Sequence, residues 1–153
     1  MGPLEFVIDD ERWRAAQGLE ARAGEAVCAA LARIQDARPG DVVVLLTDDE
    51  TVHALNKRFR NQDKPTNVLS FPAPSSENYP GDVALAYETC AREAEAAGKS
   101  LADHALHLVL HGVLHLNGYD HQEEGEAAEM EALESAILTG LGLDDPYLAG
   151  TEP

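Results

Sequence analysis

Short apolar runs of strand length alternate with longer segments of helical periodicity along this chain. The run at 42–46 is apolar at every position, which is typical of a buried central strand. The runs at 68–71 and 83–85 also have strand length, and a polar, proline-bearing loop separates them. A fourth run, at 4–8, ends in two aspartates and indicates an edge strand followed by a helix N-cap. The pattern predicts four short strands.

Apolar residues spaced three and four apart account for most of the remaining chain. A capping-box pattern at 47–50 opens a helix that ends before Pro65, with Val52, Leu55 and Phe59 expected to face inward. The other predicted helices cover 21–36, 87–97, 101–117 and 123–139. The expected fold class is α+β with an α/β-like order of elements. We expect a small mixed four-stranded sheet packed with about five helices, forming one domain over 1–153.

Composition places the chain among soluble globular proteins. Of its 153 residues, 44% are apolar and 25% are charged. There is no apolar stretch of the roughly 20 residues that cross a bilayer, and the first residues do not resemble a secretory signal. The two cysteines, Cys28 and Cys90, match no metal or redox motif and are expected to be reduced core thiols. We therefore expect a cytoplasmic protein without a membrane anchor.

The distribution of charge is more informative than its sum. The net charge of −17 argues against a general nucleic-acid binder, because phosphate contacts need Lys and Arg. After Lys99 the chain has no basic residue at all. By contrast, the short segment 57–64 carries four of the eleven basic residues. This segment is a local exception on a strongly acidic protein.

The predicted helix over 101–117 is unusual in its histidines. Its other positions between 105 and 116 are almost wholly apolar, so it is expected to be buried nearly all round and central. A buried imidazole without a partner costs about 1–3 kcal/mol. At 100° per residue, a strip of about 80° on this helix carries four histidines, at 104, 107, 111 and 115. Packing alone does not explain one face of imidazoles.

A metal site explains these histidines well. His111 and His115 lie one helical turn apart and can point at one ion. Gly118 lets the chain leave the helix and return with His121, in the H-x3-H-x2-G-x2-H spacing of three-histidine zinc sites. Three protein ligands leave a coordination position open for water or substrate, which is typical of catalytic zinc. We expect one zinc ion per chain.

The neighbouring polar residues leave some choices open. His107 could pair with His111 instead, so spacing alone does not fix the register. With the triple above, His107 is expected to support a ligand or to pack beside it. Asp120 is a candidate for orienting a ligand imidazole, although a surface aspartate in a turn is an equal alternative. His104 is expected to be a satisfied core histidine.

One absence in the histidine motif bears on mechanism. In H-E-x-x-H proteases, the residue after the first histidine is the glutamate that serves as general base. Here that residue is Gly112. Peptide hydrolysis by that route would lack its proton acceptor, so the sequence disfavours a peptidase.

Three blocks of this sequence resemble the YbeY family of bacterial rRNA maturation factors, described as single-strand-specific endoribonucleases. The block HGVLHLNGYDH over 111–121 resembles the family's histidine signature. The block RNQDKPTNVLSFP over 60–72 is similar to its second signature, and 81–83 to the strand entry that follows. The blocks agree in order and spacing across 40–121.

The resemblance implies a zinc-dependent endoribonuclease. It implies zinc ligation by His111, His115 and His121, and a functional role for Arg60. It further implies action in 16S rRNA 3′-end processing and in ribosome quality control. The small ribosomal subunit with its rRNA and an Era-type GTPase are the implied partners.

The resemblance also gives the basic segment a use. Arg60 presents a planar charged fork suited to phosphate oxygens, and it is expected to stabilise charge on the reacting phosphate. Lys57, Arg58 and Lys64 are expected to form a positive rim that binds RNA. The sequence leaves open whether water or a ribose 2′-hydroxyl attacks.

Two rival interpretations remain at this point. The protein could be a metal-dependent hydrolase of another substrate. It could instead be a ribosome-assembly factor whose zinc holds the fold. A structural site normally has four protein ligands, and the sequence offers no evident fourth, since both cysteines are distant.

Overall fold

The computed structural model describes residues 3–34, 37, 40–64, 66–74, 76–117 and 124–143. Within this part of the chain, four strands and five α-helices form a fold of the α+β class, as predicted. The strands are β1 (Leu4–Ile8), β2 (Val42–Thr47), β3 (Val68–Pro72) and β4 (Gly81–Ala86). A 3₁₀ helix η1 (Glu11–Ala15) precedes the α-helices α1 (Leu19–Leu31), α2 (Asp49–Arg60), α3 (Tyr87–Ala97), α4 (Leu101–Leu116) and α5 (Glu124–Gly140).

The four strands form one mixed sheet in the order β1-β2-β4-β3. β1, β2 and β4 run parallel, whereas β3 pairs antiparallel with β4 and forms an edge. The apolar run of β2 lies between two parallel neighbours, which explains why it lacks alternation. Gly81, where β4 begins, has φ 145°, and a Cβ there would collide with the carbonyl oxygen of Phe71. Only glycine allows β3 and β4 to close at this point.

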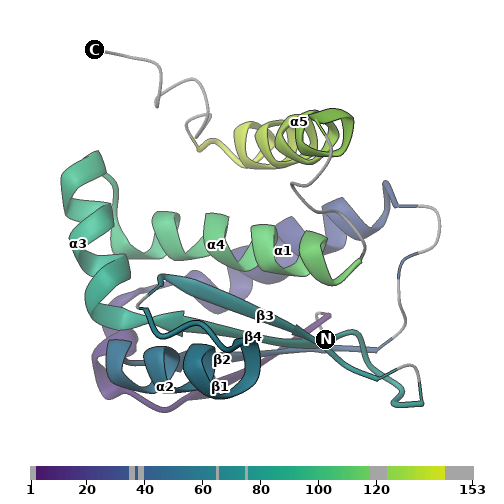
Figure 1. Ribbon diagram of the computed structural model, residues 1–153. Helices are drawn as coiled ribbons and strands as arrows, with labels where there is room; N and C mark the ends of the chain where they lie inside the picture. The colour runs from purple at the N-terminus through teal and green to yellow at the C-terminus, as the bar shows by residue number, and fades with distance from the viewer. Residues whose placement is uncertain are drawn as a thin grey trace.

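The helices form layers around the sheet (Figure 1). α1 and α4 cover one face, and α5 packs on these two helices from outside. α2 lies on the opposite face, against β3 and β4. α4 is the central helix, with ten of its sixteen residues buried. The prediction of a central helix from its nearly continuous apolar sequence is therefore confirmed.

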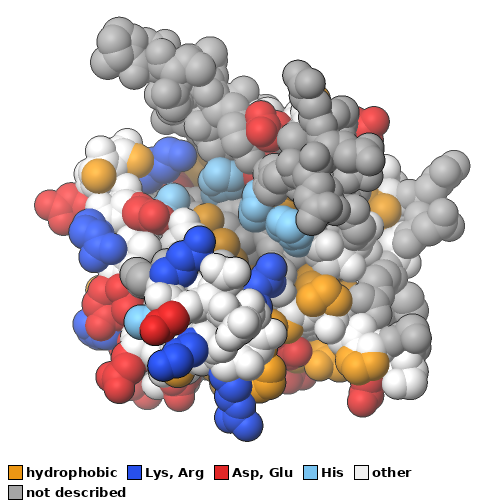
Figure 2. Space-filling model, viewed as in Figure 1, with side chains coloured by type: hydrophobic (Ala, Val, Ile, Leu, Met, Phe, Trp, Pro, Cys, Tyr) orange, Lys and Arg blue, Asp and Glu red, His pale blue; other side chains and the backbone are white. Residues whose placement is uncertain are grey.

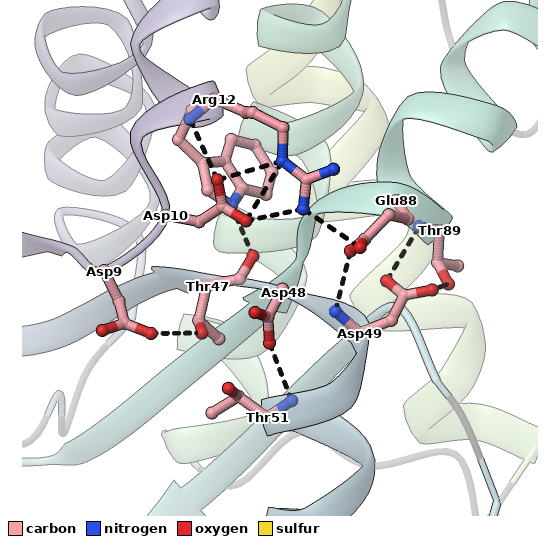
Figure 3. A network of polar contacts seen from close by, with 10 residues as sticks. Asp9, Asp10, Arg12, Thr47, Asp48, Asp49, Thr51, Glu88 and Thr89 are labelled. Atoms are coloured by element: carbon pink, nitrogen blue, oxygen red, sulfur yellow. Dashed lines mark hydrogen bonds and ion pairs between the residues drawn. The ribbon is translucent and has the colours of Figure 1, made fainter.

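A polar network fastens the connections at one end of the sheet (Figure 3). Arg12 of η1 forms ion pairs with Asp10 at 2.7 Å and with Glu88 of α3 at 3.0 Å. The Asp49 carboxylate of α2 accepts hydrogen bonds from the backbone N–H and the hydroxyl of Thr89. These contacts join η1, α2 and α3 to one another and hold the start of α2, whose far end reaches the candidate site.

One predicted helix ends earlier than expected. The helix expected over 21–36 is α1, which begins at Leu19 and ends at Leu31. Beyond it the backbone makes tighter bonds, from Arg33 N to Ala30 O and from Ile34 N to Leu31 O. Ile34 still packs on the core from this turn. The apolar periodicity therefore runs past the end of the helix.

Two side chains predicted to be buried are exposed. Phe59 is 61% exposed, because it lies near the end of α2, where its ring meets the Phe71 ring of β3 edge-on. Cys28 lies on the outer side of α1 and is exposed, which corrects the expectation of a core thiol. Cys90 is buried, as expected, and burial raises its pKa to about 12. Both thiols are free.

None of the helices in the described residues is long and apolar enough to cross a bilayer.

Candidate active site

Helix α4 supplies the histidine face of the site. The Ser100 hydroxyl caps the helix by accepting the backbone N–H of Asp103 at 3.1 Å. The apolar side chains that surround α4 fix its rotation against the sheet and against α5. The four histidines therefore lie along one side of the helix, and each contacts different neighbouring residues. Figure 2 shows histidine side chains gathered in a hollow of this face, with Lys and Arg side chains across from them.

A cavity of about 460 Å³ lies between the end of α4 and the end of α2. It brings together residues from the two sequence blocks of most interest, including His111, His115 and Arg60. Its lining comprises Asn56, Arg60, Gln62, Lys64, Thr66, Val68, Leu69, Ser70, His111 and His115. The fold thus joins segments about fifty positions apart in the chain into one polar hollow.

Two imidazoles line this cavity side by side. The rings of His111 and His115 have centroids 5.4 Å apart and planes inclined by 66°. They come from successive turns of α4, as the spacing predicts. The two residues can supply two nitrogen ligands to one ion. The predicted third ligand, His121, and Asp120 lie outside the described residues.

A buried carboxylate lies behind His111. Glu134 of α5 is fully buried and accepts a hydrogen bond from His111 Nδ1 at 3.0 Å. Its other oxygen accepts from His107 Nε2 at 2.7 Å. Burial alone would raise the pKa of Glu134, but the two imidazole hydrogen bonds lower it to about 2. The carboxylate thus lies on the Nδ1 side of the His111 ring, and the ring's Nε2 is on the other side.

Within the described residues, no group of three histidine, cysteine or carboxylate side chains is arranged to hold a metal ion. The contacts of Glu134 nevertheless bear on whether His107 or His115 is the metal-binding partner of His111, which the spacing left open. The carboxylate joins His107 and His111, so that face of the pair is directed at α5. His111 and His115 are the pair that lines the cavity. This donor set, two imidazoles with a carboxylate behind one of them, fits zinc.

Arg60 lies across the cavity from the histidines. It is the last residue of α2, and its Nη1 donates to the carbonyl oxygen of Ser70 at 3.0 Å. Asn61 follows in the left-handed conformation with φ 55°, which turns the chain away sharply. The helix end and the Ser70 contact together hold an exposed guanidinium at the rim of the cavity.

The rest of the basic segment is divided by the structure. Lys64 lines the cavity. Lys57 instead lies 3.9 Å from the Asp63 carboxylate, and the Arg58 guanidinium lies over the Phe59 ring at 5.1 Å. Neither Lys57 nor Arg58 belongs to the lining of this cavity. Their contact with RNA stays a prediction.

Asn56 is a residue that the sequence analysis missed. It is 3% exposed, and its side-chain amide donates to the carbonyl oxygen of Lys64 at 2.9 Å. Its backbone carbonyl accepts from Asn61 N and Gln62 N. Asn56 therefore holds the loop that carries Lys64 against α2. The available signal was a polar residue one turn after Val52, on the inward face of a helix.

The remaining histidine of the strip makes a separate contact. His104 Nε2 lies 2.9 Å from the Glu93 carboxylate of α3, and His104 Nδ1 is buried without a partner. It does not line the cavity. The expectation of a core histidine holds for its position, although only one of its two nitrogens is satisfied.

Close packing around Gly112 explains why α4 has no glutamate at the position after His111. A Cβ at this position would lie 2.9 Å from Val83 Cγ2 and 3.1 Å from Ser70 Oγ. The position faces the sheet at close range, and the Ser70 hydroxyl donates to the Gly112 carbonyl. A carboxylate has no room there and would not face the cavity. The packing of α4 on the sheet therefore excludes the protease-type general base.

This packing predicts the effect of a substitution. Gly112→Ala is expected to destabilise the fold by about 1 kcal/mol, because overpacking of about 1–3 kcal/mol outweighs the helix propensity gained by alanine. Gly24→Ala in α1 is the matched control: nothing lies within 4 Å of its Cβ, so stability should rise by about 0.5–1 kcal/mol. Urea unfolding measures both. Equal stabilisation by the two substitutions would contradict the close approach at Gly112.

Comparisons with known proteins place this sequence and fold. Residues 7–142 match the family model described as "Endoribonuclease YbeY". A curated relative of that name from Chelativorans sp. (strain BNC1) is 49% identical over 150 residues, covering 94% of this chain and 92% of the relative. Another from Paramagnetospirillum magneticum is 52% identical over 140 residues, covering 84% of each. The solution structure of TM1509 from Thermotoga maritima is similar in fold, with TM-score 0.57, 24% identity and 91% of each chain covered.

Proposed function

This chain belongs to the YbeY family, and from that membership we propose that it is a zinc-dependent, single-strand-specific endoribonuclease acting in rRNA maturation. The observation that supports this proposal most is the shared cavity of His111, His115 and Arg60. Two imidazoles and a permanently charged guanidinium line the same hollow.

In this proposal, two sides of the cavity contribute to phosphodiester cleavage. His111 and His115, with His121 as the third ligand, would hold a single zinc ion with one position open. When bound, zinc supplies Lewis-acid charge at a phosphoryl oxygen and lowers the pKa of a bound water. Arg60 uses one N–H group on Ser70, and the guanidinium has others with which to grip a phosphate. It would stabilise negative charge that develops as the phosphorus–oxygen bond breaks.

The loop residues around Arg60 would position the strand. Lys64 and the amide of Gln62 line the cavity beside Arg60, where a second phosphate or a base edge can bind. The side-chain amide of Asn56 holds this loop against α2. The proposal extends to a role in 16S 3′-end processing and ribosome quality control in the cytoplasm, where ribosomes are assembled.

A substrate comparison tests the proposed activity. The zinc-loaded protein is incubated with a 5′-labelled single strand from the 16S 3′ precursor, with the same strand in a duplex, and with a panel of peptides. We expect cleavage of the single strand, at least tenfold slower cleavage of the duplex, and intact peptides. Cleaved peptides with intact RNA would favour a hydrolase of another class.

The acidic body of the protein bears on its partners. A charge of −17 repels free RNA, so we propose that productive binding occurs on the small ribosomal subunit, with an Era-type GTPase as a second partner. At most four basic residues of 57–64 can contact the strand. Binding to isolated RNA should therefore be weak, with a slope of log affinity against log salt of about −3 or shallower, at roughly 0.7 per phosphate contact.

Fluorescence anisotropy measures this slope. The salt concentration is varied from about 50 to 200 mM, a range over which phosphate contacts change the affinity strongly. Lys64→Ala should make the slope shallower by about 0.7, whereas Lys99→Ala, in the connection between α3 and α4, should leave it unchanged. Tight binding of isolated RNA that does not respond to salt would contradict the proposed need for a partner.

A further inference from the structure

The fully buried carboxylate of Glu134 needs an explanation, because an ionised side chain in the core is costly unless it is well paired. Both of its oxygens are engaged by imidazole nitrogens of α4, His107 Nε2 at 2.7 Å and His111 Nδ1 at 3.0 Å. Only one of these two imidazoles, that of His111, lines the large cavity. The carboxylate thus lies directly behind a cavity-lining ring.

We propose that Glu134 is a positioning residue that holds His111 with its proton on Nδ1, so that Nε2 is presented to a zinc ion in the cavity. This inference rests on the proposed function, since it takes His111 as a zinc ligand. Glu134 itself lies on α5, behind α4, and does not line the cavity.

The chemistry of a carboxylate supports this assignment. A carboxylate oxygen only accepts hydrogen bonds, so the imidazole nitrogen that faces it carries the hydrogen. A neutral imidazole protonated at Nδ1 has its lone pair on Nε2, which is the form that binds a metal. The negative charge behind the ring also raises the basicity of the ligand and compensates part of the charge of the ion.

His107 completes the arrangement as a second donor. Its hydrogen bond to the other oxygen prevents the carboxylate from rotating away from His111. His107 itself is separated from His111 by a ring-centroid distance of 6.5 Å. It therefore supports Glu134, and Glu134 supports the ligand.

Glu134→Gln is the variant that tests the proposal. The amide keeps the shape, but one end of it donates, and an N–H group facing His111 favours the tautomer with its proton on Nε2. The zinc dissociation constant, measured by competition with a chromophoric chelator, should rise about 10- to 100-fold. His107→Gln is the matched control, because its amide still donates to Glu134 and leaves the carboxylate on His111. Its zinc affinity should stay within threefold of the wild type.

A measurement on the unmodified protein avoids any doubt about folding of the variants. In the zinc-loaded full chain with ¹⁵N-labelled histidine, long-range proton–nitrogen spectra should show His111 protonated at Nδ1 and bound to zinc through Nε2. Zinc bound through Nδ1 would overturn the inference. So would a folded Glu134→Gln protein with wild-type zinc affinity and a lowered melting temperature, which is what a merely structural carboxylate would give. In both cases the proposed function would stand, whereas a wild-type chain that binds no zinc would overturn both proposals.

Discussion

Replacing His115 with alanine is expected to reduce RNA cleavage at least ~10³-fold while the protein remains folded. His115 is half-buried at the end of α4 and lines the cavity beside His111, so its loss would remove one of three proposed zinc ligands. The core that surrounds α4 is formed by other side chains, which the substitution leaves in place. Cleavage of a labelled single strand, zinc content and thermal unfolding should be measured on the same preparation.

The pattern across these three measurements separates a catalytic ion from a structural one. A structural ion contributes to folding directly, so its loss would lower the melting temperature before it affected anything else. His53→Ala on the surface of α2 is the control, because His53 pairs with Asp63 and does not line the cavity. Its activity should remain near that of the wild type. Unfolding of His115→Ala with residual activity in its folded fraction would favour the assembly-factor interpretation.

Arg60→Ala is expected to lower the cleavage rate by about 10²- to 10³-fold and to leave the zinc content unchanged. The guanidinium lies at the cavity rim, its contact to protein is the Ser70 carbonyl, and its side chain is exposed, so little stability depends on it. Arg60→Lys should recover part of the rate, because lysine keeps the charge but not the two-pronged geometry. Single-turnover cleavage at saturating protein reports the effect on the chemical step.

Arg14→Ala provides the control for this prediction. Arg14 lies in η1, its guanidinium pairs with the Glu11 carboxylate, and it does not line the cavity. Its single-turnover rate should change by less than threefold. A full rate in Arg60→Ala, or equal losses in the two variants, would show that Arg60 has no special role at the phosphate.

The sequence predicted the fold well where local pattern and tertiary contacts agree. The unbroken apolar run of β2 and the apolar helix α4 are both central, because no other place buries such segments on every side. The prediction failed where a periodic side chain lies at an element's end. Ile34 packs from a turn beyond α1, and Phe59 lies where α2 leaves the sheet, so both continue a pattern that the structure interrupts.

The candidate site was only partly accessible to sequence reasoning. The spacing of His111 and His115 and the basic block around Arg60 are each visible in a short stretch of sequence. That one cavity joins them could not be predicted from either stretch. Glu134 of α5 is fully buried, whereas Glu129 is exposed and Glu131 is half-buried. The signal in the sequence was its spacing. Glu134 lies four residues after Met130 and three before Ile137, on the apolar side of the helix. The periodicity of a helix predicts which of its faces is buried, but not which distant helix packs against that face.

Zinc analysis of the purified chain, paired with cleavage of a single-stranded 16S precursor fragment, tests the metal-dependent mechanism most directly. We expect one zinc ion per chain, loss of cleavage when a chelator removes it, and recovery when zinc is returned. Cleavage at the full rate by a metal-free preparation would contradict the metal-dependent mechanism.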